Sequence, residues 1–247
     1  MAVWMLFMFA ATLATVQCSS VLPLDMALDS VDDAYVHCTE KMPKVIKKYY
    51  FDKEMKTNAK FRNAWYEVQK WAHPAYGLNK EQAVAVWIYT SANIYLDFNG
   101  AVNSGKKSYK YRKFQYTSLY FLLTTAIQRL KKTQPPYMTT YRRTSSIYKS
   151  VPKGTIIRFG RFASSSLNAK VNLSFGDKTC FQIQTKFGAD LSKFSKYKHQ
   201  KEVLIPPYEK FIVTSVQYRK YNPYLWCEVV YTLQSVGTQS NLNCVLS

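Results

Sequence analysis

Three short polar segments in the second half of the chain contain side chains that can act together on a charged substrate. They are residues 141–144 around Arg142, the serines at 164–166 and the segment 200–207 around Glu202. An arginine binds phosphate oxygens through two parallel hydrogen bonds, a serine hydroxyl donates and accepts, and a carboxylate stabilises nearby positive charge. Taken singly, each segment is typical of a solvated strand end, a turn or an edge strand, so only their combination is informative.

The apolar residues around these segments divide the chain into a helical first half and a β-rich second half. From about residue 30 to residue 132, apolar residues recur at steps of three and four, which predicts amphipathic helices. We expect these helices at about 61–71, 83–88 and 116–130. Asn79 before Glu81 and Gln82 is typical of a helix start, and the residues 133–136 with two prolines are typical of a helix end.

Beyond Pro136, segments rich in Val, Ile, Phe, Tyr and Thr predict strands. These segments are 155–162, 179–187, 201–205, 210–218 and 225–233. Helices followed by strands indicate an α+β fold, in which a helical N-terminal part packs on a mainly antiparallel β-sandwich. We expect residues 21–247 to form a single domain, with 21–135 mainly helical and 136–247 forming the β-rich core that carries the polar segments.

Taken in this order, Arg142, the serine triplet and Gln200-Lys201-Glu202 before Val203-Leu204-Ile205-Pro206-Pro207 resemble the arginine–serine–glutamate motifs of the mono-ADP-ribosyltransferases. The resemblance is greatest to the vertebrate ecto-enzymes that modify arginine. Four further segments resemble landmarks of that family: 24–33, 97–102, 120–124 and 240–244. The resemblance implies an ADP-ribosyltransferase fold and an enzyme that breaks the nicotinamide–ribose bond of NAD or NADP. It also implies transfer of ADP-ribose to a protein acceptor, without a permanently bound cofactor.

The resemblance gives each of the three residues a catalytic role. Arg142 would bind the pyrophosphate or a ribose edge of NAD, where a planar guanidinium makes two hydrogen bonds. Ser164 would orient the nicotinamide ribose and support the other two side chains. Glu202 would accept a hydrogen bond from the ribose 2′-hydroxyl and stabilise the oxocarbenium-like cation that forms as nicotinamide leaves.

Three further residues resemble NAD contacts of the family. Tyr89 lies in a predicted helix, and Ser195 lies in the loop before the expected catalytic glutamate. Phe175 is a candidate to stack on nicotinamide, with a core aromatic as the alternative. Asn172 begins an Asn-x-Ser glycosylation sequon.

Gln200 departs from the family pattern, because arginine-specific relatives carry glutamate at this acceptor-side position. A neutral amide offers neither counter-charge nor basicity to a guanidinium whose pKa is above 12. The neighbouring Lys198, His199 and Lys201 would also repel a cationic acceptor. NAD glycohydrolase activity, with water as the main acceptor, is therefore the alternative to arginine transfer.

The first residues of the chain are typical of an export signal. Residues 3–16 form an almost unbroken apolar run, and small residues at 18–20 provide a peptidase site. A buried N-terminal helix is the alternative. The run is shorter than the roughly 20 residues that span a bilayer, no later segment is apolar enough to span one, and residues 240–247 carry no tail for GPI attachment. We expect residues 1–20 to be a signal peptide and the product to be secreted and extracellular.

Removal of Cys18 with the signal leaves four cysteines, an even number that favours disulfides in an exported protein. Among the three ways to pair them, we favour Cys38 with Cys244, which ties the two ends together. Cys180 and Cys227, which lie in two predicted strands, form the other favoured pair. A metal site is the alternative, and the lack of a CxxC pair and of histidines at ligand spacing disfavours it.

The chain has 34 Lys and Arg residues against 15 Asp and Glu residues, a formal net charge of +19. Such a charge favours anionic partners, including dinucleotides, glycans, microbial surfaces and nucleic acid. Because the lysines are scattered along the chain, we expect a general basic surface without a nucleic-acid groove, on a monomeric protein. A non-catalytic cationic protein that binds glycans or microbial surfaces is the alternative of a different class, since fold does not imply function.

Overall fold

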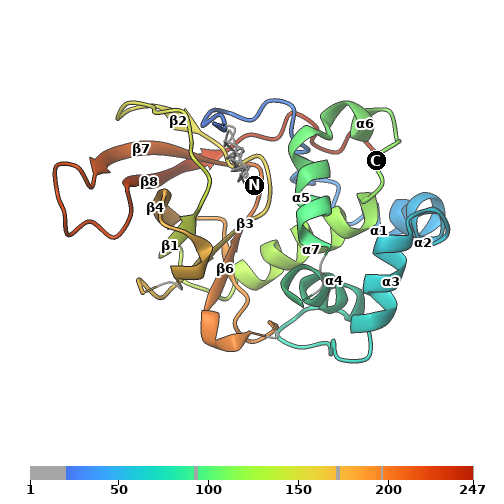
Figure 1. The fold of residues 1–247 in the computed structure, drawn as a ribbon. Coiled ribbons are helices and arrows are strands. Elements are labelled where there is room, and N and C mark those ends of the chain that lie inside the picture. Colours follow the sequence, from blue (N-terminus) through green and yellow to red (C-terminus); the bar gives the residue numbers. More distant parts are fainter. Residues whose placement is uncertain (1–20, 92–93, 171–172, 196, 247) are drawn as a thin grey trace, which may run out of the picture.

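The computed structural model describes residues 21–246 except 92–93, 171–172 and 196. The expected signal peptide at 1–20 and the Asn172 sequon lie outside the described residues. Figure 1 shows the helices gathered on one side of the molecule and the strands on the other. The α+β class expected from the change in apolar spacing is confirmed.

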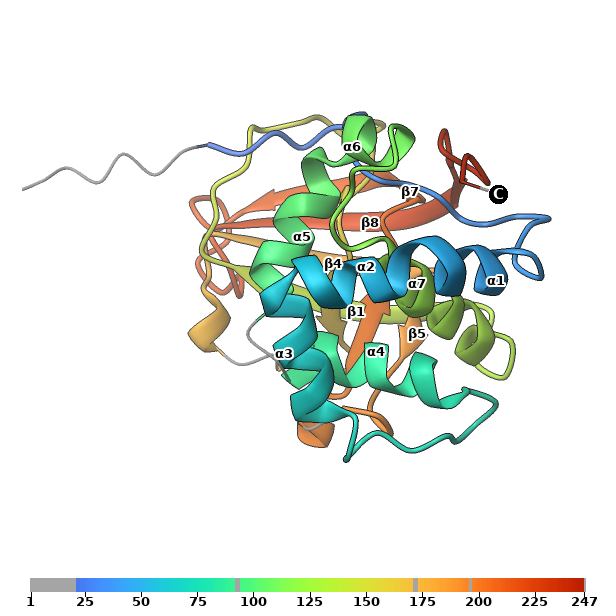
Figure 2. The ribbon, with the colours of Figure 1, turned by 90° about the vertical axis from the view of Figure 1, so that its right-hand side faces the viewer.

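The helical side is built from helices along residues 42–131, and the first three helical segments follow one another without a loop. Their bounds are α1 Met42–Ile46, a π-helical segment Lys47–Phe51, α2 Asp52–Thr57, α3 Ala59–Val68, α4 Lys80–Ser91, α5 Tyr95–Ser104, α6 Lys106–Lys110 and α7 Thr117–Lys131. The three helices predicted from apolar spacing correspond to α3, α4 and α7. Figure 2 shows that α1 and α2 run across the outer face of this side, with α6 above them.

Polar side chains determine where the two longest helices, α4 and α7, begin. At α4, Asn79 Oδ1 accepts from the Gln82 N–H at 2.8 Å, and Gln82 Oε1 accepts from the Asn79 N–H at 3.2 Å. This reciprocal pair is a capping box, which confirms the predicted helix start. At α7, the buried carboxylate of Glu54 accepts from the N–H groups of Thr117 and Ser118. The start of α7 therefore depends on a residue of α2.

The strands form one hydrogen-bonded sheet in the order β2-β7-β8-β4-β1-β3-β6-β5. Their bounds are β1 Met138–Thr144, β2 Ile156–Ile157, β3 Ala163–Ser166, β4 Thr179–Thr185, β5 Ala189–Asp190, β6 Glu202–Ile205, β7 Glu209–Tyr218 and β8 Val229–Thr238. All neighbouring pairs are antiparallel except β4 with β8. The mainly antiparallel β core is therefore confirmed. The strands expected to form a sandwich are all hydrogen-bonded into one sheet.

One hydrophobic core joins the helices to one half of the sheet. Helical residues such as Leu119 and Leu123 of α7 belong to the same cluster as Phe162, Ala189 and Leu204 of the sheet region. A second cluster, around Phe181 and Phe211, lies among the strands. The helices and this half of the sheet therefore share one core, and the single domain expected for residues 21–247 stays a prediction.

The beginning and end of the described chain are held together. A disulfide joins Cys38 to Cys244, and a second joins Cys180 to Cys227. These are the two pairs that the sequence favours. Next to the first bond, the carboxylate of Asp33 accepts from the Tyr35 and Cys244 N–H groups, at 2.8 and 3.0 Å. Residues 33–38 and the segment around Cys244 are therefore held against each other.

Candidate active site

The three predicted catalytic residues lie on three neighbouring strands. Arg142 is on β1, Ser164 on β3 and Glu202 at the start of β6, and the sheet order places β3 between the other two. The register pairs Tyr141 with Ser166 and Ser166 with Glu202. These residues, distant in the sequence, are therefore brought to one end of the central strands, which Figure 1 shows next to the helices.

Arg142 is attached directly to the strand of Ser164. One of its guanidinium nitrogens donates a hydrogen bond of 2.7 Å to the backbone carbonyl oxygen of Ser164. The next residue, Arg143, points to the opposite face of the sheet because side chains alternate along a strand. Arg143 donates to the carbonyl oxygen of Trp226 at 3.0 Å, and its guanidinium lies 4.9 Å from the Trp226 ring centre. Of these two adjacent arginines, only Arg142 faces the candidate site.

The segment before Ser164 is fixed by two buried side chains of the helical half. Tyr89 of α4 donates from its hydroxyl to the Phe162 carbonyl oxygen at 2.9 Å. Asn99 of α5 accepts from the Phe162 N–H at 3.1 Å and donates to the Tyr89 hydroxyl at 2.9 Å. Ser164 donates to the same hydroxyl at 3.4 Å. Tyr89 and Asn99 thus bind the N–H and the carbonyl group of Phe162, and they position Ser164 from the side of the helices.

Glu202 is a buried carboxylate next to this group, and the residue is only 8% exposed. Burial raises the pKa of Glu202, whereas a hydrogen bond with Ser164 and the positive charge of Arg142 act in the opposite direction. Burial also raises the pKa of Tyr89 to about 12, so its phenol is neutral at physiological pH. The site therefore combines one cation, one buried acid and neutral hydroxyl groups.

The other two serines of the triplet hold the segment that contains Glu202. Ser165 donates to the Val203 carbonyl oxygen at 3.0 Å, and Ser166 donates to the Gln200 carbonyl oxygen at 2.6 Å. Between them, Lys201 has a φ of 47°, a left-handed conformation that turns the chain from a short 3₁₀ helix into β6. Gln200 is partly exposed at this turn, and Lys198, His199 and Lys201 beside it are exposed.

The other expected NAD contacts occupy different environments. Tyr89 is 5% exposed, with its hydroxyl directed at Phe162 and Ser164. Ser195 is 1% exposed and accepts from the Tyr197 N–H at 3.0 Å. Phe175 is 47% exposed on a 3₁₀ turn, Leu173–Phe175. Phe175 is therefore a surface side chain and not the core aromatic of the alternative interpretation.

Asn99 is the site residue that sequence reasoning did not single out. Its segment, residues 97–102, resembles a family landmark, and in the structure Asn99 is 8% exposed and requires hydrogen-bond partners. An asparagine with apolar neighbours, Phe98 and Val102, is the sequence signal that points to such a role.

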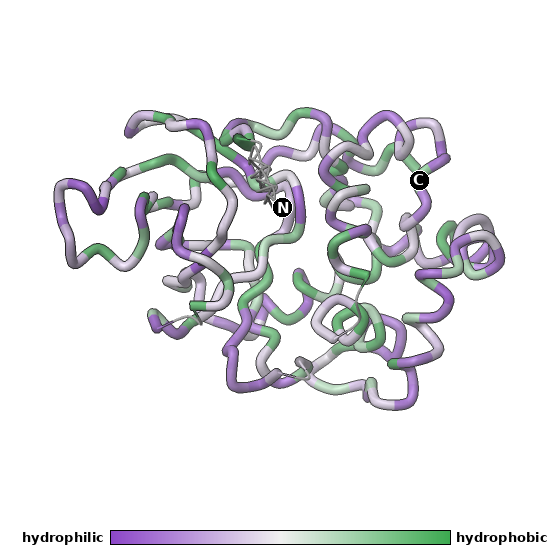
Figure 3. The backbone as a smooth tube through the Cα atoms, in the orientation of Figure 1, coloured by the Kyte–Doolittle hydropathy of each residue, from purple (hydrophilic) through white to green (hydrophobic). Residues whose placement is uncertain are grey.

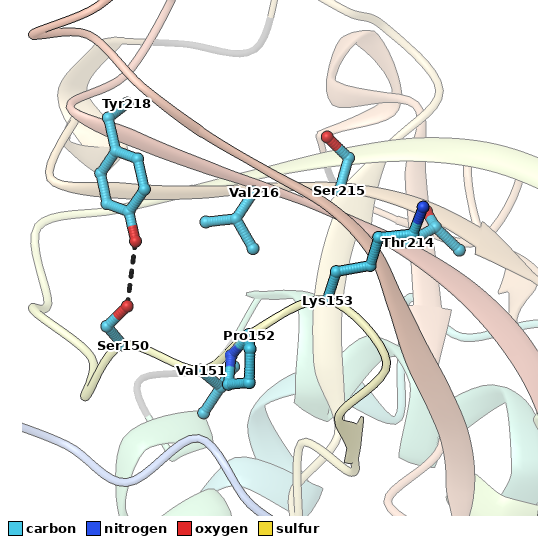
Figure 4. Close-up of a pocket in the computed structure, with 8 residues that line it drawn as sticks. All are labelled: Ser150, Val151, Pro152, Lys153, Thr214, Ser215, Val216 and Tyr218. Atoms are coloured by element: carbon cyan, nitrogen blue, oxygen red, sulfur yellow. Dashed lines mark hydrogen bonds between the residues drawn. The ribbon is translucent and has the colours of Figure 1, made fainter.

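A surface groove lies at a different part of the sheet. It has a volume of about 630 Å³ and lies between residues 150–153 and β7 (Figure 4). The hydroxyls of Ser150 and Tyr218 are joined by a hydrogen bond of 2.9 Å beside it. In the sheet order, β8 and β4 separate β7 from β1. The groove is therefore distinct from the group around Arg142.

Within the described ranges, no three side chains of His, Cys, Asp or Glu are arranged to hold a metal ion. Among the same residues, no helix has the length and apolar character that crossing a membrane requires. The arrangement that the structure does contain is a guanidinium, a hydroxyl and a buried carboxylate on adjacent strands of an α+β fold.

This fold is that of an ADP-ribosyltransferase. The structure superposes on a crystal structure of the eukaryotic mono-ADP-ribosyltransferase ART2.2 with a TM-score of 0.74 and 31% identity, covering 92% of this chain and all of that chain. Two further solved structures of ART2.2, both of variants, contain NADH or NAD and match with TM-scores of 0.74 and 0.73.

The chain belongs to the NAD:arginine ADP-ribosyltransferase family, whose model matches residues 24–227. It is 36% identical to NAD(P)(+)–arginine ADP-ribosyltransferase 2 of Gallus gallus over 237 residues, which is 90% of this chain and 72% of that protein. It is 35% identical to ecto-ADP-ribosyltransferase 5 of Rattus norvegicus over 215 residues, covering 81% of this chain and 70% of the relative. The disulfides and these relatives are consistent with an extracellular protein.

Proposed function

We propose that this protein is an NAD-dependent mono-ADP-ribosyltransferase that breaks the nicotinamide–ribose bond and transfers ADP-ribose to a protein acceptor. The family relationship makes arginine the first choice of acceptor. The observation that carries the proposal is that Arg142, Ser164 and Glu202 meet on adjacent strands of this family's fold. NAD or NADP is a substrate in this reaction, and no permanently bound cofactor is required.

Arg142 binds the dinucleotide in the proposed mechanism. Its bond to the Ser164 carbonyl oxygen engages one guanidinium nitrogen and fixes the orientation of the planar group. The remaining N–H groups suit the doubly charged pyrophosphate, since a guanidinium and a phosphate match in geometry.

Glu202 stabilises the transition state. As nicotinamide departs with the bonding electron pair, positive charge develops on the ribose ring, and a buried carboxylate acts strongly on such charge because the surroundings have a low dielectric constant. The hydroxyl of Ser164 is held by its hydrogen bond to Tyr89. Its hydrogen bond with Glu202 then fixes the orientation of the carboxylate. The nucleophile then attacks the ribose carbon from which nicotinamide has left, and loses its proton to solvent water.

Water is the second candidate acceptor, because Gln200 stands at the acceptor-side position. The Gln200 side chain is neutral, and three cationic or titratable neighbours, Lys198, His199 and Lys201, are exposed around it. This environment provides no counter-charge for the guanidinium of an acceptor arginine. NAD hydrolysis requires only the residues on the NAD side and is insensitive to this loss.

An assay with NAD and the arginine analogue agmatine tests both candidates. We expect nicotinamide release by the wild-type protein, with ADP-ribosyl-agmatine as product if arginine is the acceptor and free ADP-ribose if water is. Glu202→Gln is expected to lower nicotinamide release by about 10²–10³-fold. Glu228→Gln, which removes an exposed acid that pairs with Lys178 and not with any of the three catalytic residues, serves as the control. Wild-type nicotinamide release by the Glu202 variant would overturn the proposal.

The proposal also includes a secreted, monomeric protein with a basic surface. The alternative of a non-catalytic cationic binder predicts glycan binding without NAD turnover. Glu202→Ala separates the two functions, because it removes a buried carboxylate needed for turnover and leaves the exposed lysines unchanged. Retention of all NAD-dependent signal in that variant would contradict the enzyme assignment.

A further inference from the structure

The helical half carries a dense group of exposed cations on two chain segments. One segment is α1, the π-helical segment and α2, and the other is α6 with the loop that follows it. We call this group the basic face, and its members are Lys41, Lys44, Lys47, Lys48, Lys53, Lys56, Lys106, Lys107, Lys110, Arg112 and Lys113. All of them are exposed except Lys106, which is partly buried.

The loop that follows α6 ends against α2, so the two segments of the basic face meet at that point. Glu54 of α2 binds the N–H groups of Thr117 and Ser118, and Asn58 donates to the Gln115 carbonyl oxygen at 3.0 Å. These bonds attach the end of the α6 loop to α2. Figure 2 shows α1, α2 and α6 on the same side of the molecule, and the tube in Figure 3 shows hydrophilic residues interspersed with hydrophobic ones along them.

The cations of this face have little nearby negative charge. Four ion pairs occur among the described residues, and none of them includes a member of the basic face. Glu54 is 4% exposed and is directed at α7, and Asp97 is paired with Lys60. The exposed acids Asp29, Glu40 and Asp52 lie along these segments. The basic residues greatly outnumber these acids, so the face has a strong positive field.

The shape and composition of this face suit a linear polyanion. Residues 42–57 form one continuous helical rod of about 24 Å at 1.5 Å per residue. A line of lysines along such a rod presents charges at intervals to an extended chain. Tyr49 and Tyr111 are 53% and 61% exposed among the lysines, and tyrosine rings with a polar tip suit contact with sugar rings.

We propose that the basic face binds a sulfated glycosaminoglycan chain, at a position separate from the group around Arg142. Sulfated glycans are the linear polyanions that an extracellular protein meets, and the disulfides and family are consistent with that location. A membrane surface is disfavoured because, among the described residues 41–57 and 106–113 of this face, the only large exposed hydrophobic side chains are Tyr49 and Tyr111. Such a face lacks the apolar side chains with which interfacial helices enter lipid.

Two variants with equal loss of charge test the proposal on the full-length protein. The first changes Lys47, Lys48, Lys107 and Lys110 to alanine. The second, a control on the sheet half, changes Lys149, Lys153, Lys186 and Lys220 to alanine, all of them exposed. Binding to a heparin-derived decasaccharide is measured by calorimetry at near-physiological salt, together with melting temperature and nicotinamide release.

We expect the first variant to weaken decasaccharide binding by at least about tenfold and the control by less than about twofold, because only the first removes contacts with the polyanion. Both variants should keep the wild-type melting temperature and nicotinamide release. Equal weakening in the two variants would show that the charge acts diffusely and would overturn the proposal. Equally tight binding of desulfated heparin, or tighter binding of a DNA duplex or of phosphatidylserine vesicles through the same lysines, would also overturn it.

Discussion

The guanidinium of Arg142 and the backbone carbonyl oxygen of Ser164 are joined by a hydrogen bond of 2.7 Å. This bond connects β1 to β3 at the place where both strands approach Glu202. Because it uses the Ser164 backbone, the Ser164 hydroxyl remains directed at Tyr89 and Glu202. One arginine therefore orders the site and, in the proposed function, binds the substrate.

Arg142→Lys should weaken NAD binding while leaving the fold intact. Lysine keeps the positive charge, but its ammonium group cannot bond the Ser164 carbonyl and a pyrophosphate in the same fixed plane. We expect the KM for NAD to rise by about tenfold or more, equivalent to the loss of a charge-assisted hydrogen bond. Initial rates measured against NAD concentration check this. Arg143→Lys is the matched control, since Arg143 packs on Trp226 at the other face, and an equal rise in its KM would contradict the assignment.

Gln200→Glu should increase transfer of ADP-ribose to agmatine relative to hydrolysis. The new carboxylate would attract the guanidinium and accept its proton, and general-base assistance contributes about 10²–10⁴-fold in favourable cases. We expect a product ratio shifted by at least about tenfold toward the adduct, measured by chromatography of the ADP-ribose products. Gln200→Ala, which adds no charge, should leave nicotinamide release near wild type. An unchanged product ratio in the glutamate variant would refute the role given to Gln200.

Asn99→Ala should reduce both stability and activity. The Asn99 amide bonds the Phe162 N–H and the Tyr89 hydroxyl in a buried environment, and loss of these bonds leaves polar groups unsatisfied. We expect a loss of about 1–3 kcal/mol in the free energy of unfolding, with a lower kcat from the displaced Ser164. Urea denaturation and nicotinamide release at saturating NAD measure the two effects. Asn103→Ala, one turn along and only partly buried, is the control and should change neither quantity comparably.

The stability of the protein should fall as the pH rises from about 4.5 to about 7. Burial raises the pKa of Glu54 from 4.5 to about 7, and burial likewise raises the pKa of Asp33 from 3.8 to about 6. In this interval the folded state binds more protons than the unfolded state, so the free energy of unfolding decreases with increasing pH. The shift at Glu54 corresponds to about 3 kcal/mol. Denaturant unfolding at pH 5 and pH 7.5 measures the change.

Glu54→Gln isolates the contribution of Glu54 from that of the remaining charges. An amide oxygen still accepts from the start of α7 but has no proton to bind, so the variant should lose less stability between the two pH values. The same pH dependence in the wild type and the variant would argue against a raised pKa at Glu54.

Removal of the Cys38–Cys244 disulfide should destabilise the protein strongly. The bond joins residues separated by 206 positions and sits beside the Asp33 contacts with the chain end. The chain-entropy model gives about 5 kcal/mol for a loop of this length. The double variant Cys38→Ser and Cys244→Ser should therefore melt at a lower temperature than the wild type. The double variant Cys180→Ser and Cys227→Ser, which opens a loop of 47 residues, should lose less, and the reverse order would count against this account.

Several features of the fold were predictable because local chemistry decides them. Asn79 and Gln82 are themselves the capping residues, and α4 begins beside Asn79. The change from three- and four-residue spacing to β-branched and aromatic runs predicted which half is helical. The position of Glu54 was not predictable in this way, because its carboxylate caps a helix that begins more than 60 residues later.

The sequence by itself determined the residue types, their order and therefore the chemistry: an arginine, a serine triplet and a glutamate ahead of a buried strand. Only the tertiary structure decided which of two adjacent arginines faces the site and which side chains hold Ser164 in place. The reason is physical. Strand order joins segments that are not consecutive, with β1 lying between β4 and β3, and the alternation of side chains assigns a face only once that pairing exists. The hydrogen bonds of Tyr89 and Asn99 to Phe162 likewise form only after α4 and α5 have packed against the start of β3.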